Sequence, residues 1–182
     1  MRVIAGAAKG RRLSAPTGLD VRPTSDRVRE ALFSMLEAHL GDLDGQRVAD
    51  LACGSGALGI EALSRGAGSC TFVDISARSL RAARANVEAV GLAGAGVSFV
   101  KDDLVRWAGR QGPEALDLVL VDPPYAWDAW AQLLDGLAGK TAAVAAEADR
   151  DIAPPPAWAS LRSRRHGGTV VSVFVPHRDP RP

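Results

Sequence analysis

From about residue 46, short apolar runs alternate along the chain with segments in which apolar residues recur at helical spacing. The apolar runs predict five strands, at residues 47–52, 69–74, 97–101, 116–121 and 141–147. The segments between them predict helices at residues 57–65, 77–90 and 127–137. The second helix has a good N-cap in Ser76 and a stop signal in Gly91. Strands that alternate with helices in this way are typical of a parallel α/β sheet.

The patterns on either side of this core are different. Before it, Thr24 is expected to cap a helix with apolar residues at helical spacing: Val28, Leu32, Met35, Leu36 and Leu40. Residues 1–23 predict a short β-arm, with a hairpin through Lys9-Gly10. After the core, runs at residues 158–165 and 169–175 flank a short glycine turn and predict a closing antiparallel hairpin.

Together these elements predict an α/β fold with a mostly parallel seven-stranded sheet, a C-terminal antiparallel hairpin, and a short N-terminal β-arm plus helix. A length of 182 residues with 47% hydrophobic content fits a single domain, 1–182. We divide it into an arm and helix at 1–40, a core at 46–147 and the hairpin at 157–176.

Composition excludes several classes of protein. No stretch approaches the roughly 18 consecutive apolar residues of a membrane span, and the N-terminus has no signal-peptide core. Cys53 and Cys70 are too few for a disulfide framework, which favours a reducing cytoplasm. The three histidines lack metal-ligand spacing, so we expect no metal. We take a monomer as the default.

The net charge of +1 hides a division along the chain. Residues 1–30 carry seven Lys and Arg against three acids, and residues 160–182 carry five against one. The segment between them has a balance of −7. Basic ends around an acidic body favour a polyanion that contacts the termini. The alternative is a chance excess of arginine from a GC-rich coding style.

The most informative motif is Asp122-Pro123-Pro124-Tyr125, which follows the apolar run 116–121. Prolines have no N–H to donate and fix φ near about −65°, so they stiffen the backbone and leave the Pro123 carbonyl free beside the Asp122 carboxylate. Tyr125 offers a flat face nearby. Two acceptors and a stacking ring suit a planar group that bears an amine, such as a nucleobase.

A glycine turn lies between the first strand and the next helix. Gly54, Gly56 and Gly59 form G-x-G-x-x-G, which lets the backbone approach a ligand closely. A dinucleotide fold uses the same pattern to bind pyrophosphate, and NAD is the main competing ligand. Asp50, however, would sit poorly beside phosphates. It suits a cationic ligand, such as the amino group and sulfonium of S-adenosylmethionine.

Further acids stand at the ends of the next two strands. Asp74 is placed to accept ribose hydroxyls, and Asp102 or Asp103 to receive an adenine amine. Cys53 is expected to pack beside the cofactor and not to act as a nucleophile. The expected cofactor-binding residues are Asp50, Cys53, Gly54, Ser55, Gly56, Asp74, Ile75, Asp102, Asp103, Leu104 and Asp122.

These segments resemble the class I S-adenosylmethionine-dependent methyltransferases, and Asp122 to Tyr125 resemble their amino-methylating branch. The N-terminal third is similar to the RsmD family of 16S rRNA guanine-N2 methyltransferases. The resemblance covers most of residues 1–147, and the segments that carry it are 2–6, 10–13, Arg22-Pro23-Thr24-Ser25-Asp26-Arg27-Val28-Arg29-Glu30-Ala31-Leu32-Phe33 and Gly54 to Ala67. Two segments depart from the family pattern: Ala52-Cys53 before the glycine, and Asp74-Ile75-Ser76, where Glu is more usual at the end of the second strand and an acid is kept.

The resemblance implies a Rossmann-like class I methyltransferase fold with S-adenosylmethionine as cofactor. It also implies methyl transfer to a guanine N2 of the position-966 type in 16S rRNA, on an assembled or assembling small ribosomal subunit. The Asp122 carboxylate and the Pro123 carbonyl would orient the amine, as catalytic residues together with Pro124 and Tyr125. Tyr125 would stack on the extruded base, with a cap over the sheet edge as the alternative.

The arginines of the N-terminal region are the candidates for phosphate contacts. The expected RNA-binding residues are Lys9, Arg11, Arg12, Arg22, Arg27 and Arg29. An intrahelical pair with Glu30 is the alternative for Arg27. In the hairpin, Arg162, Arg164 and Arg165 either extend the RNA face or solvate an exposed strand.

Three other functions compete with this interpretation. An adenine-N6 DNA methyltransferase also uses Asp-Pro-Pro-Tyr, but the short chain leaves no room for a recognition module. A protein glutamine methyltransferase carries Asn at the position of Asp122. A non-catalytic RNA-binding assembly factor could keep the methyltransferase fold. The complete set of Asp50, Gly54, Gly56, Asp74 and Asp122 argues against such a loss of catalytic function.

Overall fold

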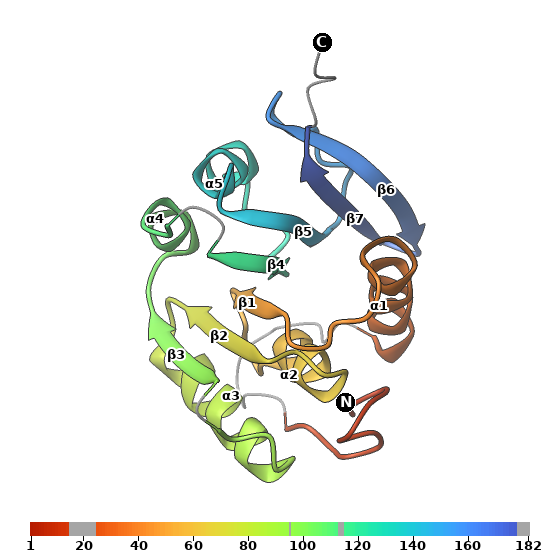
Figure 1. The fold of residues 1–182 in the computed structure, drawn as a ribbon, viewed down its shortest axis with the longest axis vertical. Coiled ribbons are helices and arrows are strands. Elements are labelled where there is room, and N and C mark those ends of the chain that lie inside the picture. Colours follow the sequence, from red (N-terminus) through yellow and green to blue (C-terminus); the bar gives the residue numbers. More distant parts are fainter. Residues whose placement is uncertain (15–24, 95, 113–114, 178–182) are drawn as a thin grey trace.

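The computed structural model describes residues 1–14, 25–94, 96–112 and 115–177. Within these ranges the chain forms a seven-stranded sheet with the order β3-β2-β1-β4-β5-β7-β6 (Figure 1). The strands are β1 (Arg47–Leu51), β2 (Ser69–Asp74), β3 (Val97–Lys101), β4 (Leu116–Val121), β5 (Thr141–Ala148), β6 (Trp158–His166) and β7 (Thr169–Pro176). The helices are α1 (Asp26–Leu40), α2 (Ala57–Ser64), α3 (Ala77–Ala89), α4 (Leu104–Gly109) and α5 (Trp130–Leu137).

Strands β1 to β5 are parallel, whereas β7 runs antiparallel to β5, and β6 antiparallel to β7. The central strands are buried on both faces, which explains their nearly continuous apolar sequences; Leu118 to Val121 are fully buried. The α/β fold with a mostly parallel seven-stranded sheet and a closing hairpin is therefore confirmed.

Two layers of helices cover the sheet (Figure 1). Helices α1, α2 and α3 pack on one face with alternate strand residues such as Leu118 and Leu120. Helices α4 and α5 pack on the other face with their neighbours Val119 and Val121. The alternation follows from the two-residue period of a strand. In the described residues, no helix is long and apolar enough to cross a membrane.

Four predicted details differ from the structure. Helix α4 was not predicted, because six residues are too few for a periodic pattern; Asp103 caps it. Helix α5 begins at Trp130 and not at Trp127, whose N–H instead closes a turn onto the Pro124 carbonyl. Ser25 caps α1, where its hydroxyl accepts the Val28 N–H, so the assignment to Thr24, itself outside the described residues, was wrong. Strands β1, β5, β6 and β7 end one residue from the predicted position, whereas β2, β3 and β4 match their predicted bounds.

The N-terminal arm forms a minimal β-structure over residues 1–14. Arg2 and Arg12 make an antiparallel bridge, and the chain reverses between them. The Val3 N–H donates to the Arg11 carbonyl, and the Gly10 N–H to the Val3 carbonyl. Gly10 has a φ of 82°, which supports the predicted turn through Lys9-Gly10. The rest of the predicted arm, residues 15–23, lies outside the described residues.

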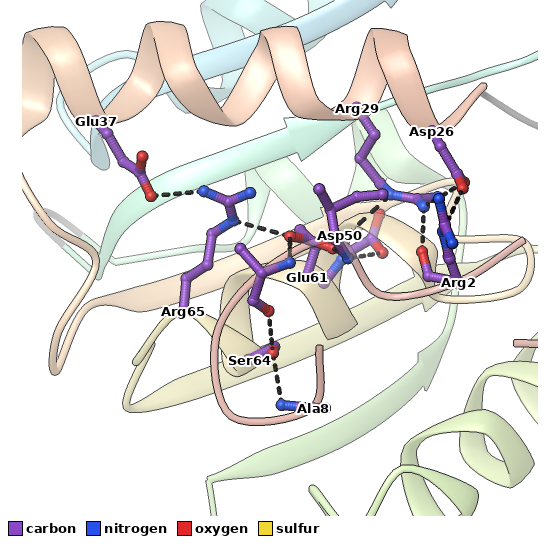
Figure 2. A network of polar contacts seen from close by, with 12 residues as sticks. Arg2, Ala8, Asp26, Arg29, Glu37, Asp50, Glu61, Ser64 and Arg65 are labelled. Carbon is purple, nitrogen blue, oxygen red and sulfur yellow. Dashed lines mark hydrogen bonds and ion pairs between the residues drawn. The ribbon is translucent and has the colours of Figure 1, made fainter. Parts of the chain in front are cut away.

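A buried carboxylate on α2 holds this arm against the domain (Figure 2). Glu61 accepts the Ile4 N–H at 2.7 Å and the Ala5 N–H at 3.0 Å. One turn later, the Ser64 hydroxyl accepts the Ala8 N–H at 2.9 Å and donates to the Ala5 carbonyl. These bonds give the backbone donors of the arm partners that a flexible tail would otherwise find only in water.

Two arginines complete the network in Figure 2 and tie α1 into it. Arg29 is fully buried; it donates to the Arg2 carbonyl and to Asp26, and its Nε lies 3.9 Å from Glu61. Arg65 bridges Glu61 at 2.9 Å and Glu37 at 2.6 Å. The arm, α1 and α2 are therefore joined through one charged network.

We expect Glu61→Gln to release the arm. The amide has one acceptor oxygen where the carboxylate has two, and it leaves the buried Arg29 with Asp26 as its one remaining carboxylate partner. Loss of one partner of a buried pair costs about 3–5 kcal/mol in the free energy of unfolding. The measurement is urea unfolding, together with hydrogen exchange at residues 3–11.

The control is Asp117→Asn, which removes an exposed pair with Arg47 on the sheet. Exposed pairs contribute roughly 0–1 kcal/mol. Equal losses of stability in the two variants, or unchanged exchange in the arm, would contradict the role given to Glu61.

Candidate active site

The candidate site lies at the carboxyl ends of β1, β2 and β4. The register places Leu51 at the end of β1 level with Val73 on one side and Val121 on the other. Strand order reverses between β1 and β4, and a crevice at such a switch point is where open α/β sheets bind ligands. Asp74, the last residue of β2, and Asp122, the first residue after β4, are thus brought to the same edge of the sheet.

The glycine turn after β1 has the backbone that its sequence predicts. Gly54 and Gly56 have φ values of 55° and 79°, a region that favours glycine. Ala52 shares this region with a φ of 55°, the only non-glycine residue to do so among the described ones. A non-glycine residue held there is strained, and such strain gathers at functional sites.

Helix α2 approaches the sheet more closely than a side chain would allow. A Cβ on Gly59 would lie 2.4 Å from a ring carbon of Phe72 and 2.7 Å from the Cys70 sulfur. A Cβ on Gly56 would lie 3.0 Å from that of Ala83. Both glycines therefore serve helix packing, and Gly54 alone borders open space, with only the Ala52 carbonyl oxygen 4.0 Å from a built Cβ.

Asp50 lies inside the protein, beneath this turn. It is 1% exposed, and its carboxylate accepts the Gly59 N–H at 2.8 Å. Burial raises the pKa of Asp50 from 3.8 to about 8, against the opposing effect of the Gly59 bond, and the charges of Asp122 and Asp74 raise it further. The carboxylate thus supports the glycine turn from within. In this structure it is not open to direct contact with a cation.

Asp74 links the end of β2 to the glycine turn. Its Oδ2 accepts the Gly54 N–H at 3.0 Å, and its Oδ1 accepts the Ser76 N–H at 2.8 Å. Each oxygen keeps a further lone pair, so the carboxylate can still accept hydroxyls. Ile75, next in sequence, is 69% exposed, an apolar surface beside that carboxylate. Ser55 is half-buried, and its carbonyl accepts from Asn86 on α3.

The two acids after β3 have different surroundings. Asp102 is buried and paired with Arg106 at 2.6 Å and with Arg110. Asp103 is half-buried and accepts the Arg106 N–H as the cap of α4. Because the Asp102 carboxylate is committed to two arginines, Asp103 is the better placed of the two for an adenine amine. Leu104, the first residue of α4, is partly buried at the edge of the core.

The loop after β4 carries the motif. Asp122 is half-buried, Pro123 is buried and Pro124 is exposed. Tyr125 is 37% exposed, and its hydroxyl lies 2.7 Å from the Thr169 hydroxyl at the start of β7. The ring is therefore anchored at its tip by the C-terminal hairpin, while much of its surface remains open.

An arginine that we did not anticipate holds this loop. Arg150, just after β5, donates to the carbonyls of Tyr125 at 3.2 Å and Trp127 at 3.3 Å, and it pairs with Asp128 at 2.6 Å. Neither Arg150 nor Thr169 stands in a local motif, since each contacts the loop across more than twenty residues. An alignment of co-varying positions is the signal that would have found them.

Several predicted residues have roles that the structure makes clearer. Cys53 is buried, and burial raises the pKa of its thiol well above its usual range, which fits a packing residue and not a nucleophile. Arg29 is a correction: its side chain is fully buried in the network of Figure 2 and cannot reach a phosphate. Lys9, Arg11, Arg12 and Arg27 are exposed, and Arg22 lies outside the described residues.

Comparison with known proteins shows the family of this chain. The family described as Conserved hypothetical protein 95 matches residues 1–175. The chain belongs to this family. Its relatives include "Ribosomal RNA small subunit methyltransferase D" of Escherichia coli K12, 34% identical over 69% of the chain and 60% of that protein. "Putative rRNA methyltransferase YlbH" of Bacillus subtilis is 33% identical over 96% of the chain and 98% of its own length.

A solved structure agrees with this membership. "Putative methyltransferase yhhF from Escherichia coli" superposes with a TM-score of 0.82 and 26% identity, over 98% of the chain and 99% of that protein. The expected Rossmann-like methyltransferase fold and the resemblance to the RsmD family are thereby confirmed. In the described ranges, no group of His, Cys, Asp and Glu could hold a metal ion.

The raised pKa of Asp50 has a consequence for stability. Because the folded protein holds this proton more tightly than the unfolded chain does, the carboxyl group stabilises the fold at low pH. That contribution is lost between about pH 4 and pH 8. Asp50→Asn keeps an oxygen for the Gly59 N–H but does not titrate. We expect its free energy of unfolding, measured in urea, to fall less than that of the wild type over this range. Parallel pH profiles would contradict the assignment.

The Arg150 contacts predict that this side chain orders the motif loop. Arg150→Ala removes the donors to the Tyr125 and Trp127 carbonyls, so hydrogen exchange at residues 124–129 should accelerate while exchange in β4 stays unchanged. Arg165→Ala, which removes a neighbouring exposed arginine, is the matched control. Equal protection of the loop in both variants would show that Arg150 does not order it.

Proposed function

We propose that this protein transfers a methyl group from S-adenosylmethionine to the exocyclic N2 amine of one guanine in 16S rRNA. The observation that carries the proposal is the Asp122-to-Tyr125 loop at the switch point of the sheet, beside the glycine turn. Family membership along residues 1–175 supports the same assignment. We propose further that the protein acts as a cytoplasmic monomer on an assembled or assembling small ribosomal subunit, with a base of the position-966 type as target.

The acidic character of the site fits this cofactor. Asp74 and Asp122 lie close enough to Asp50 for their charges to raise its pKa. A concentration of negative charge would repel a pyrophosphate and attract an ammonium or sulfonium group. In this arrangement Asp74 and Ile75 would hold the adenosine, the turn Cys53-Gly54-Ser55-Gly56 the methionine chain, and Asp103 with Leu104 the adenine edge.

The cofactor supplies an activated methyl group, and the protein orients the acceptor. A guanine N2 lone pair is conjugated with the ring, so the amine is a poor nucleophile. The Asp122 carboxylate and the Pro123 carbonyl would accept its two N–H groups and turn the lone pair toward the methyl carbon. The new N–C bond forms as the C–S bond breaks, and the amine then loses a proton to solvent. The acceptors also stabilise the positive charge that develops on nitrogen.

Tyr125 would provide a platform for the extruded base. Its ring is partly exposed, and the bond from its hydroxyl to Thr169 limits the orientations it can take. Pro124 is exposed beside it and offers a second apolar surface. Stacking of a base on an aromatic ring contributes roughly 1–3 kcal/mol.

The proposal is tested by tritiated methyl transfer from S-adenosylmethionine. Unmodified small subunits, naked 16S rRNA and duplex DNA are offered to the wild type and to Asp122→Ala, and the labelled nucleoside is identified. We expect N2-methylguanosine in rRNA, with a loss of about 100-fold or more in the variant. Labelled N6-methyladenine in DNA would show that the substrate is adenine in DNA and not guanine in rRNA. Cofactor binding without transfer to any substrate would favour a non-catalytic assembly factor.

The stacking role of Tyr125 is tested separately, by Tyr125→Phe and Tyr125→Ala. The phenyl ring keeps the stack and loses only the bond to Thr169, so kcat/KM for the rRNA substrate should stay near the wild-type value. Alanine removes the stack and should lower kcat/KM by about 5- to 150-fold. If both variants retain full activity and Tyr125→Ala instead lowers stability, the ring is a cap over the sheet edge.

A further inference from the structure

A groove of about 390 Å³ separates α1 from the edge strand β6, away from the strand ends that form the candidate site. Met35 and Ala38 of α1 lie on one side, and Arg162, Arg164 and His166 of β6 on the other. In Figure 1, α1 lies next to β6 and β7, beyond the parallel part of the sheet. The groove thus joins a mainly apolar helix face to a basic strand.

The two arginines point to the same face of the sheet. Arg162 pairs with Val173 and Arg164 with Val171, and both valines pack in the core on the α1 side. Side chains two residues apart on a strand lie about 7 Å apart. That separation is comparable to the distance between successive phosphates along an RNA strand. Arg165, between them and the turn, points to the other face.

Arg162 and Arg164 are both exposed on the surface of β6. Within the described residues, neither Arg162 nor Arg164 makes an ion pair or a side-chain hydrogen bond, whereas Arg165 pairs with Asp151 at 3.6 Å. No carboxylate lines the groove, and His39 adds a further polar ring. Two exposed, unpaired cations on one line create a positive strip that a polyanion can neutralise.

The groove is connected to the candidate active site through the hairpin turn. His166 pairs with Thr169 across that turn, and the Thr169 hydroxyl bonds to the Tyr125 hydroxyl at 2.7 Å. The basic face of β6 therefore begins beside the loop that would receive the base and leads away from it along Arg164 and Arg162. A strand of nucleic acid leaving the site along this path would meet the arginines in order.

We propose that this groove binds the single-stranded RNA that flanks the methylated guanine. Arg164 and Arg162 contact successive phosphates, and the helix surface around Ala31 and Ala38 receives a flanking base. The inference rests on the proposed function, since it takes RNA as the substrate. It also resolves the two roles open for the hairpin arginines: Arg162 and Arg164 bind RNA, and Arg165 does not.

The test compares the double variant Arg162→Ala/Arg164→Ala, and each single variant, with Arg165→Ala, which removes one positive charge from the opposite face of the same strand. Binding of a fluorescent single-stranded RNA fragment of 16S rRNA is measured by anisotropy at several salt concentrations. We expect the double variant to bind about 10- to 100-fold more weakly, with a salt slope lower by about 1.4, the value for two phosphate contacts to a single strand. Arg165→Ala should match the wild type.

Methyl transfer to small subunits separates this inference from the proposed function. We expect the double variant to show a raised KM for subunits and a kcat within twofold of the wild type. If the wild type binds the RNA fragment but transfers no methyl group, the proposed reaction is wrong. The RNA affinities of the double variant and of Arg165→Ala then decide whether the groove binds RNA.

Two results would overturn the groove assignment. The first is an affinity and a salt slope for RNA that match the wild type in the double variant. The second is weaker binding to subunits with unchanged binding to the RNA fragment, because the groove would then contact a ribosomal protein. Cofactor affinity, measured by calorimetry, should be the same in the wild type and in every variant and shows that the variants are folded.

Discussion

The rest of the structure depends on how α2 packs against the sheet. That packing is fixed by the hydrogen bond from the Gly59 N–H to the buried Asp50 carboxylate. The contact is possible because Gly59 has no side chain where Phe72 and Cys70 approach. It fixes the turn that precedes the helix. The charges of Asp74 and Asp122 raise the pKa of the same Asp50 carboxyl group. The residue that positions α2 is therefore electrostatically coupled to the acidic residues of the candidate site.

Helix α2 also connects this site to the N-terminal arm. Its first turn belongs to the glycine loop, and its second carries Glu61, which binds the arm backbone and faces Arg29. On the far side of α1, the groove with Arg162 and Arg164 continues from the hairpin turn beside Tyr125. The proposed RNA surface and the proposed methyl-transfer site are therefore linked through α1, α2 and the β6–β7 hairpin.

The sequence predicted the sheet well and the polar contacts poorly, for physical reasons. Strands buried on both faces, such as β4, are nearly continuous apolar runs, so the local sequence is enough to predict them. Helix α4 is too short to show a period. Arg29 is buried among Asp26 on its own helix, the Arg2 carbonyl, and Glu61, which lies 32 positions away. The sequence gives no local sign of the last two partners. The Arg150 and Thr169 contacts with the motif loop likewise arise only when distant segments meet.

We propose that the acidic strand ends hold S-adenosylmethionine with its methyl group facing Asp122, and a crystal structure with S-adenosylhomocysteine tests this arrangement. We expect ribose hydroxyls on the Asp74 carboxylate, the methionine chain along Gly54 to Gly56, and the sulfur beside the Asp122 and Pro123 acceptors. A cofactor bound away from these strand ends, or one whose sulfur points away from Asp122, would contradict it.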